Sequence, residues 1–338
     1  MARVGIVGAS GYAGAELLRL CLGHPDLDVA WATAETQAGV PVGRLYPNLA
    51  AAAPDLVFAQ YDPALAEGLD LVFLALPHGA SATLVPDLAK RVGVVVDLAA
   101  DFRLQDPAAY EQWYGEAHPS PELLADFAYG LPELFRPPLV GATAVAVPGC
   151  YPTAAALALT PLVRAGAIEA TGVIVDAASG VSGAGRPPKA ATTFCMVDED
   201  FRAYGLVDHR HTPEIEQATG ASVLFTPHLA PMNRGILATC YARPTGAMST
   251  TEVLEVLAEA YRGQRFVVVG EEPPSTKATA GTNCAHLSAR FDPRSGWVLV
   301  LCALDNLGKG AAGQAVQCAN LALGLDEGAG LSVAGFLP

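Results

Sequence analysis

Cys150 is the residue of this sequence whose setting most favours chemistry. It stands in VAVPGCYPTAAALALTPL, residues 145–162, between a Pro-Gly break and an Ala/Leu-rich run that predicts a helix. Pro152 suits the first helical position, where its missing N–H costs nothing. We therefore expect Cys150 at or just before a helix N-terminus, where unpaired N–H groups and the positive end of the helix dipole favour a thiolate over a thiol. The pattern predicts a nucleophile; a small buried thiol at a strand-to-helix turn is the alternative.

Two histidines follow in DHRHTPEIEQ, residues 208–217. His209 and His211 lie two positions apart without a thiolate or carboxylate partner at helical spacing, so the pair is a weak metal motif and we expect no metal site. One of them is better interpreted as the acid/base for Cys150, because thiol nucleophiles are usually activated by a nearby imidazole. A surface pair without function is the alternative.

Two glycine-rich turns, one near each end of the sequence, predict a dinucleotide site. In GASGYAG, Gly8, Gly11 and Gly14 stand between a strand-like and a helix-like segment, where glycines let the backbone approach a pyrophosphate at a helix N-terminus. The second turn is DNLGKGAAGQA, residues 305–315. Glu35, 21 residues beyond Gly14, stands where an acidic residue would bind a ribose 2′-OH, which taken alone favours NAD.

Three further loops carry candidate ligand contacts. LALPHGAS places Pro77 and His78 after a buried strand, where they could line a cofactor or form a simple turn. SGVSGAGRPP offers small residues, two hydroxyls, free N–H groups and Arg186, which predicts an oxyanion or phosphate cradle rather than a flexible surface loop. FTPHLAPMNRG ends with Arg234, a candidate for a substrate carboxylate.

Length and composition restrict the class of protein. The chain has 338 residues, of which 51% are apolar and 16% charged, which indicates a well-packed α/β enzyme of two domains. A net charge of −14 gives no electrostatic reason to bind nucleic acid or an anionic membrane. No apolar run is long enough to span a bilayer, and no signal peptide is evident at the start. The seven scattered cysteines indicate a reducing compartment, so we expect a cytoplasmic protein.

The order of the predicted elements indicates the fold. In the first half, short buried strands alternate with helical segments, which predicts a parallel, doubly wound sheet whose last strand is 140–147. After Cys150 strands dominate, which predicts an α+β domain with a mostly antiparallel sheet. We expect a Rossmann domain formed by residues 1–148 and 308–338, and a catalytic and oligomerisation domain formed by residues 149–307.

Seven motifs stand in one order along this chain, and together they resemble the N-acetyl-γ-glutamyl-phosphate reductase family, the arginine-biosynthesis relatives of aspartate-semialdehyde dehydrogenase. They are GASGYAG, LALPHG, DFRL, PGCYPT, SGVSGAGR, HRHTPEIEQ and DNLGKGAAGQA. The resemblance implies reductive dephosphorylation of an acyl phosphate in a homodimer or homotetramer, with NADP rather than NAD as the cofactor. It also implies that Cys150 is the nucleophile, carrying a thioester, and that His211 is the acid/base. Two features depart from the motifs: Pro187-Pro188 follows Arg186, and Glu35 stands where the NADP phosphate would lie.

The expected site follows from these motifs. The cofactor is expected to contact Gly8, Ser10, Gly11, Tyr12, Gly14, Pro77, His78, Ser179, Gly180, Asn306, Gly310 and Gly313. The substrate and its phosphate are expected to contact Arg103, Ser182, Gly183, Arg186, His209 and Arg234. The same chemistry on a carrier-linked aminoadipyl phosphate, and a catalytically silent dinucleotide sensor, are the alternatives.

Overall fold

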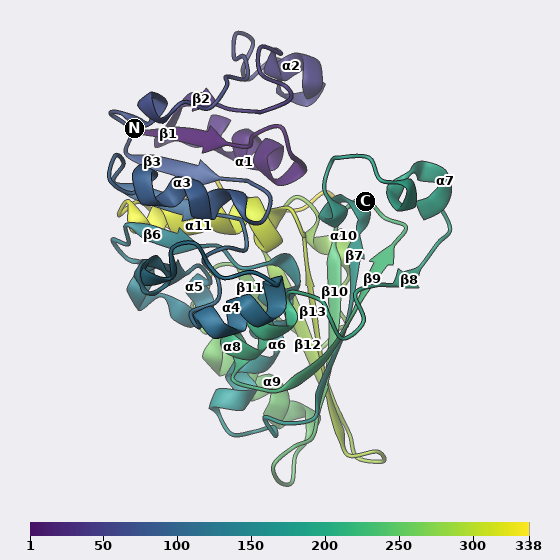
Figure 1. Cartoon of the computed structure of the whole chain (residues 1–338). Helices are drawn as coiled ribbons and strands as arrows, with labels where there is room; N and C mark the ends of the chain where they lie inside the picture. The colour runs from purple at the N-terminus through teal and green to yellow at the C-terminus, as the bar shows by residue number, and fades with distance from the viewer. Residues whose placement is uncertain (338) are drawn as a thin grey trace. The chain divides into compact units, whose positions relative to one another are not determined.

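The computed structural model describes residues 1–337, which form two compact units (Figure 1). The first unit contains Met1–Pro148 and Ala311–Leu331, and the second contains Gly149–Gly310 together with the chain from Ser332 onward. The end of the chain therefore differs from the expected 308–338 segment of the first domain. Its last residues pair with the second unit: Asn283 N donates to Ser332 O at 2.9 Å and Phe336 N to Ala280 O at 3.1 Å.

A six-stranded, wholly parallel sheet forms the centre of the first unit, with the order β2-β1-β3-β4-β6-β5. Its strands are β1 (Ala2–Val7), β2 (Leu27–Ala32), β3 (Leu71–Leu74), β4 (Val94–Asp97), β5 (Ala128–Tyr129) and β6 (Ala144–Ala146). The chain leaves β1 toward β2 on one side and returns to β3 on the other. In such open sheets ligands bind outside the carboxyl ends of the strands at this reversal point.

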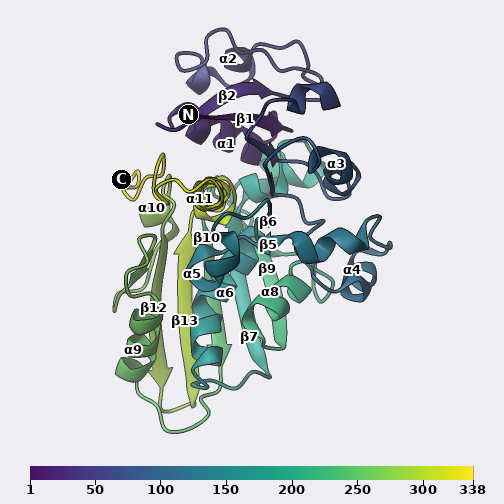
Figure 2. The same ribbon diagram turned by 90° about the vertical axis from the view of Figure 1, so that its left-hand side faces the viewer.

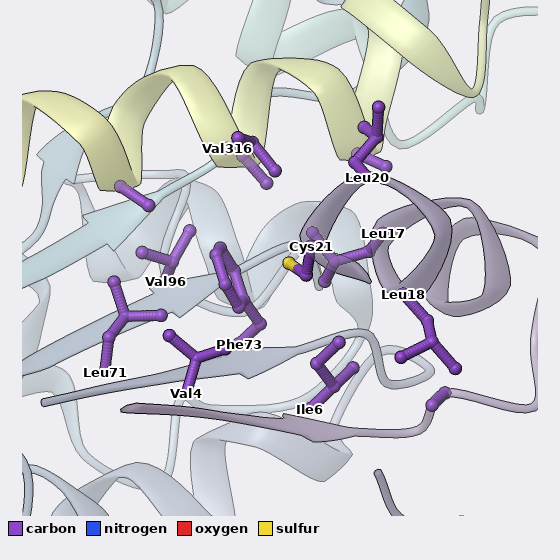
Figure 3. Close-up of a cluster of buried hydrophobic side chains, with 14 of the residues drawn as sticks. Val4, Ile6, Leu17, Leu18, Leu20, Cys21, Leu71, Phe73, Val96 and Val316 are labelled. Atoms are coloured by element: carbon purple, nitrogen blue, oxygen red, sulfur yellow. The ribbon is translucent and has the colours of Figure 1, made fainter. Parts of the chain in front are cut away.

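Helices cover both faces of this sheet. The helices of the unit are α1 (Tyr12–Leu22), α2 (Val42–Leu45), α3 (Ala80–Leu88), α4 (Pro107–Tyr114), α5 (Pro132–Phe135) and α11 (Gly313–Ala322). Leu17 of α1 and Val316 of α11 pack over Phe73 on one face (Figure 3). Val85 of α3 belongs to the cluster on the other face. The predicted doubly wound fold is confirmed.

The last strand predicted for this domain, 140–147, is confirmed as β6. The two-residue strand β5, which pairs beyond β6 at the edge of the sheet, was not expected. The apolar run Asp55–Ala59, whose composition favours a strand, forms only isolated bridges, Thr33 with Ala59 and Pro41 with Val57. Both are short segments whose pairing depends on partners elsewhere in the sequence, so local pattern did not reveal them.

A seven-stranded mixed sheet forms the second unit, with the order β11-β12-β13-β10-β7-β9-β8. Its strands are β7 (Val173–Gly180), β8 (Arg202–Ala203), β9 (Val223–Ala230), β10 (Ile236–Ala242), β11 (Val267–Val269), β12 (Ala285–Asp292) and β13 (Trp297–Leu304). Among the described residues four of its pairings are antiparallel, and β7–β9 and β11–β12 are parallel. The sheet is mostly antiparallel, as predicted.

Helices α6, α8 and α9 lie along one face of this sheet (Figures 1 and 2). The helices of the unit are α6 (Cys150–Arg164), α7 (Phe194–Val197), α8 (Thr212–Thr219), α9 (Thr250–Ala260) and α10 (Thr276–Thr279). The segment ATTFCMVDEDFRAYG, whose residues favour a helix, forms only the short helix α7, followed by β8. Glu199, with φ of 62°, breaks the helical path between them. Within residues 1–337 no helix is long and apolar enough to cross a bilayer.

Candidate active site

Cys150 is the first residue of α6, as the sequence predicts. Gly149 occupies the N-cap with extended backbone, and the first turn of the helix holds no acidic residue. The thiol is half-buried. Pro152 is the third helical residue rather than the first. The N–H groups and the positive dipole end of the helix therefore surround Cys150, and these favour its thiolate.

The other cysteines lack this setting. Burial raises the pKa of Cys21 and of Cys302 to about 12 and raises the pKa of Cys240 further, so these thiols stay protonated at neutral pH. Cys284 and Cys318 are buried, and the exposed Cys195 lies on the four-residue helix α7. Of the seven, Cys150 alone combines access with a long helix N-terminus.

The segment 305–310 passes directly against Cys150. A Cβ placed on Gly310 would lie 2.8 Å from the Cβ of Cys150, closer than two such atoms approach, so only glycine fits there. The backbone bond from Gly310 N to Asp305 O, at 2.9 Å, holds this turn. The predicted second glycine turn therefore packs directly against Cys150.

Helix α8 brings the two histidines and a buried carboxylate to the same region. The carboxylate of Glu214, on α8, is fully buried. It accepts a hydrogen bond from Gly149 N at 2.8 Å and so fixes the residue before Cys150. His211 is the N-cap of α8, and its ring lies 5.9 Å from the ring of Tyr151, the neighbour of Cys150. Packing of α8 on α6 thus places His211 beside the cysteine's own turn.

The imidazole of His209 forms a hydrogen bond with a nearby backbone N–H. Its Nδ1 accepts a hydrogen bond from His211 N at 3.1 Å, and the two rings lie 4.8 Å apart. Burial, and then the charge of Arg210, lower the pKa of His209 to about 4. A neutral His209 with Nδ1 as acceptor carries its proton on Nε2, so it can donate one hydrogen bond but is a poor acid at neutral pH.

The predicted phosphate loop is pinned to the loop that carries Arg234. Backbone N–H groups of Gly180, Val181 and Ser182 donate to the carbonyls of Gly235, Met232 and Asn233, at 2.9, 2.9 and 3.2 Å. The expectation of free N–H groups is therefore wrong for these three residues, because two adjacent loops satisfy one another's backbone.

The buried side chain of Asn306 joins the same two loops. Its Oδ1 accepts from Gly235 N at 2.8 Å, and its Nδ2 donates to Ser182 Oγ at 2.9 Å. As an acceptor in that bond, Ser182 keeps its own hydroxyl hydrogen to donate elsewhere. Ser179, by contrast, is buried and donates to Gly180 O at 3.0 Å.

The two cations predicted for the substrate are differently placed. Nη1 of Arg234 lies 3.2 Å from Oδ2 of the buried Asp305, which also accepts from Gly281 N at 2.7 Å. Arg186 follows Gly183 and the left-handed Gly185, and its Nε has no acceptor within the part of the chain that the structure describes. Arg186 thus keeps a side-chain nitrogen that could bind an anion.

The first glycine turn has the form of a dinucleotide site. A Cβ on Gly8, where φ is +83°, would lie 2.5 Å from Ala75 O, and a Cβ on Gly14 would lie 2.4 Å from Gly8 O. Gly11 is different: it is the N-cap of α1, its φ is −78°, and the nearest atom to its built Cβ is 3.7 Å away. Gly8 and Gly14 are required by packing, whereas Gly11 leaves open space for a ligand at a helix N-terminus.

Neighbouring residues complete this turn. Tyr46 Oη donates to Ser10 O at 2.7 Å, while Tyr12 starts α1 with its side chain partly exposed. Gly313 begins α11. Glu35 lies exposed beyond β2, where it was expected. The residues present therefore suit a bound dinucleotide.

His78 and Arg103 take up contacts inside the first unit. Nδ1 of His78 lies 2.7 Å from Oδ1 of the buried Asp101, and its ring stacks on Tyr114 at 4.2 Å, while the adjacent Pro77 is exposed. Arg103 is buried and its Nη2 donates to Leu98 O at 2.6 Å.

Sequence reasoning missed three buried carboxylates that organise these segments, Asp101, Glu214 and Asp305. Their partners are 22, 65 and up to 71 positions away in the sequence, so no local spacing signals them. No group of histidine, cysteine and acidic side chains suited to a metal occurs in residues 1–337.

Comparison with known proteins gives consistent matches along the chain. Residues 3–142 match the family described as "Semialdehyde dehydrogenase, NAD binding domain", and residues 150–306 match "Semialdehyde dehydrogenase, dimerisation domain". N-acetyl-gamma-glutamyl-phosphate reductase of Symbiobacterium thermophilum is 47% identical over 342 residues, which cover 98% of either chain. The enzyme of that name from Salinispora tropica is 51% identical over 341 residues, covering 99% of both.

Solved structures agree on the fold. Aspartate semialdehyde dehydrogenase II of Vibrio cholerae has a TM-score of 0.71 at 17% identity, covering 96% of this chain and 98% of its own. The aspartate semialdehyde dehydrogenase of Candida albicans with NADP has a TM-score of 0.68 at 17% identity, covering 95% and 98%.

Proposed function

The chain belongs to the semialdehyde dehydrogenase family, and we propose that it reduces N-acetyl-γ-glutamyl phosphate to N-acetylglutamate semialdehyde and phosphate, with Cys150 as the nucleophile. The observation that carries the proposal is Cys150 itself, the first residue of a long helix whose first turn holds no acidic residue. The names of its full-length relatives support this substrate, and the family resemblance of the motifs implies a step of arginine biosynthesis.

The first step is attack of the Cys150 thiolate on the acyl carbon of the mixed anhydride. A carbon–sulfur bond forms, the carbon–oxygen bond to phosphate breaks, and the departing phosphate carries away the negative charge. Arg186 and the hydroxyl of Ser182 are the groups we assign to that phosphate, because one is a cation with an uncommitted Nε and the other retains a hydrogen to donate.

The second step reduces the resulting thioester. When bound, the nicotinamide cofactor supplies a hydride. His211 donates a proton to the oxyanion that forms at the former carbonyl oxygen, and it takes that proton back as the aldehyde leaves. The electrons of the carbon–sulfur bond return to Cys150, so the helix N-terminus that first favoured the thiolate also makes it a good leaving group.

The first unit would hold the cofactor. We assign its pyrophosphate to the N-terminus of α1, with Gly11 providing close approach, and the adenosine ribose to the region of Glu35. NADP is the proposed cofactor from the family resemblance, although the carboxylate of Glu35 would disfavour a 2′-phosphate. The ratio of activities with the two cofactors tests the role of Glu35.

We also propose a homo-oligomer formed through the face of the second sheet opposite α6. On β7, β10 and β13 fully buried residues alternate with half-buried ones, and the half-buried set includes Ile174, Leu237, Tyr241, Leu299 and Leu301. A half-covered apolar face of this kind favours association with a second copy. Light scattering after size-exclusion chromatography measures the state; a monomer at micromolar concentration contradicts it.

The reverse reaction is the direct test of the proposed activity. N-acetylglutamate semialdehyde, phosphate, and either NADP or NAD are mixed with the protein, and the absorbance of the reduced cofactor is followed. Phosphate-dependent reduction supports the proposal. Folded protein that binds nucleotide but reduces neither cofactor contradicts it, and would indicate a carrier-linked aminoadipyl substrate or a non-catalytic sensor.

A further inference from the structure

Two buried carboxylates share one serine hydroxyl at the carboxyl ends of β3 and β4. Ser81 Oγ lies 2.8 Å from Oδ2 of Asp97 and 2.7 Å from Oδ2 of Asp101, and none of the three side chains is exposed. A serine hydroxyl has a single hydrogen, so it cannot donate to two ionised carboxylates at once. One of the two acids must therefore carry a proton and donate it to Ser81.

The surrounding donors decide which acid is protonated. Asp101 accepts hydrogen bonds from Gly79 N at 2.7 Å and from Ala82 N at 3.0 Å, and Nδ1 of His78 lies 2.7 Å from its Oδ1. Asp97 receives one backbone donor, Ala99 N, at 2.9 Å on its other oxygen. Because Asp101 has more hydrogen-bond donors around it, the negative charge is more stable on Asp101, and the proton lies on Oδ2 of Asp97.

The electrostatic environment points the same way. Burial, reinforced by the charge of Asp101, raises the pKa of Asp97 to about 7 against the opposing effects of Ala99, Ser81 and Arg103. Burial also disfavours the charge on Asp101, but the contacts from His78, Gly79, Ser81 and Ala82 outweigh it and lower its pKa to about 2. One acid of the pair is thus neutral and the other ionised.

This pair holds the loop that adjoins the glycine turn. Asp101 fixes Gly79 and the start of α3, and the same loop begins at Ala75, whose N donates to Val7 O at 2.8 Å. Ala75 O is also the atom nearest to the built Cβ of Gly8, at 2.5 Å. The loop from β3 to α3 therefore lies against the turn assigned to the pyrophosphate.

We propose that Asp97 is a positioning residue that holds a proton at neutral pH and, through Ser81, fixes Asp101 and the loop 75–82 in the form that binds the dinucleotide. Loss of that proton leaves two adjacent carboxylates with one hydrogen between them, and their repulsion displaces the loop. Dinucleotide affinity then falls as the pH rises. The inference rests on the proposed function for its ligand, and on the first unit alone for its geometry.

Other titrating groups face this pair and must be separated from it. Nε2 of His78 lies 3.7 Å from Oε1 of Glu116, and burial lowers the pKa of His118, whose ring packs on Phe102. Arg103 lies on the same loop as Asp101. A variant that alters Asp97 alone, without touching these groups, isolates its contribution.

Asp97→Asn is that variant, because an amide retains the acceptor for Ala99 N and the donor to Ser81 but does not titrate. Ser81→Ala cuts the connection, and Thr83→Ala removes an exposed hydroxyl from the same helix as the matched control. In the cofactor-free proteins at neutral pH, infrared spectroscopy should show the C=O stretch of a protonated carboxylic acid. We expect that band to be absent in Asp97→Asn, shifted in Ser81→Ala and unchanged in Thr83→Ala.

Binding is measured by calorimetric titration with NADP from pH 6 to pH 9. We expect the Kd of the wild type, divided by the Kd of Asp97→Asn, to rise at least about fivefold from pH 6 to pH 9. Titration of the ligand's own phosphate affects both proteins equally, so it cancels in this ratio. If Asp97→Asn fails to fold, two other results still test whether Asp97 holds a proton. The carboxylic-acid band of the wild type should disappear at high pH, and it should shift in Ser81→Ala.

Three results would overturn the inference, and they are distinguishable. A carboxylic-acid band that survives in folded Asp97→Asn places the proton elsewhere. A Kd ratio constant with pH, with tight binding retained, refutes the positioning role and leaves the proposed function intact. Absence of dinucleotide binding in every folded variant, the control included, refutes the proposed function and with it the role of the loop.

Discussion

Helices α3 and α6 begin alike and use their N-termini for different purposes. Each is preceded by a glycine N-cap, and neither is capped by a side chain of that N-cap residue. At α3 the carboxylate of Asp101, from a distant loop, accepts from Gly79 N and Ala82 N. At α6 the carboxylate of Glu214 accepts from Gly149 N, and the first helical residue is a cysteine.

The comparison shows that a helix N-terminus can stabilise a neighbouring loop or favour the ionised form of a reactive side chain. In the first unit the buried carboxylate of Asp101 accepts from N–H groups of both the N-cap and the first turn of α3, which stabilises the loop. In the second unit the buried carboxylate of Glu214 accepts from the N-cap N–H, and the first residue inside the helix is a thiol on which the positive end of the dipole acts. Substitutions of Cys150 and His211 test the role in catalysis, and substitution of Asp101 tests the role in stability.

Replacing Cys150 by Ala gives the largest expected effect. We expect kcat/KM to fall by about 10⁴-fold or more, because no other side chain of this turn offers a nucleophile. The free energy of unfolding should change by no more than about 1 kcal/mol, since a small half-buried thiol fills little of the core. Steady-state rates and urea unfolding measure the two quantities. Near wild-type rates in the Ala variant would refute the thioester route.

Replacing His211 by Asn should lower kcat by about 10²–10⁴-fold, the usual contribution of a positioned acid/base. His209→Asn is the matched control: its side-chain oxygen accepts from His211 N as Nδ1 of the imidazole does. Because His209 is already neutral at neutral pH, we expect a smaller loss, seen mainly in KM. If only the His209 variant loses kcat, the two roles are reversed.

The sequence was sufficient for the parts of this comparison that are local. Cys150 at a helix start, the strand-turn-helix around Gly11 and the strands β2, β7 and β13 follow from patterns of a few residues, because propensity and periodicity act at short range. The division into two units after residue 148 followed from the change from alternating strands and helices to mostly strands.

What the sequence could not supply depends on contacts between distant segments. Asp101 and Glu214 have ordinary surroundings in sequence, and only the fold brings each to a helix N-terminus. The free N–H groups expected near Val181 failed for the same reason, because the loop that pairs with them is about 50 residues away in sequence, as Met232 shows. Helix propensity over 191–205 was overridden by strand pairing at β8.

Replacing Asp101 by Asn should cost on the order of 2 kcal/mol of unfolding free energy at neutral pH. The pKa of Asp101 is lowered to about 2, so its stabilisation is present above the ordinary aspartate pKa near 4 and is lost as the pH falls toward 2. Denaturant unfolding at pH 7 and at pH 3 measures this. The difference between wild type and variant should shrink at the lower pH; a constant difference would mean that the charge does not matter.

Replacing Gly11 by Ala gives the smallest expected effect and tests the third helix N-terminus, that of α1. The position has φ of −78° and its built Cβ meets only Gly8 O, at 3.7 Å, so the protein alone accommodates alanine. A bound pyrophosphate would meet the added methyl group, so we expect the Kd for NADP to rise about tenfold while unfolding changes by less than about 1 kcal/mol.

Two glycines of the same helix provide the contrast. Gly14→Ala places a Cβ 2.4 Å from Gly8 O and should destabilise the fold as well as binding, whereas Gly23→Ala, at the other end of α1 with 3.8 Å of space, should change neither. Calorimetric titration and thermal unfolding of the three variants measure both effects. A Gly11→Ala protein that binds NADP as tightly as wild type would exclude the α1 N-terminus as the pyrophosphate site.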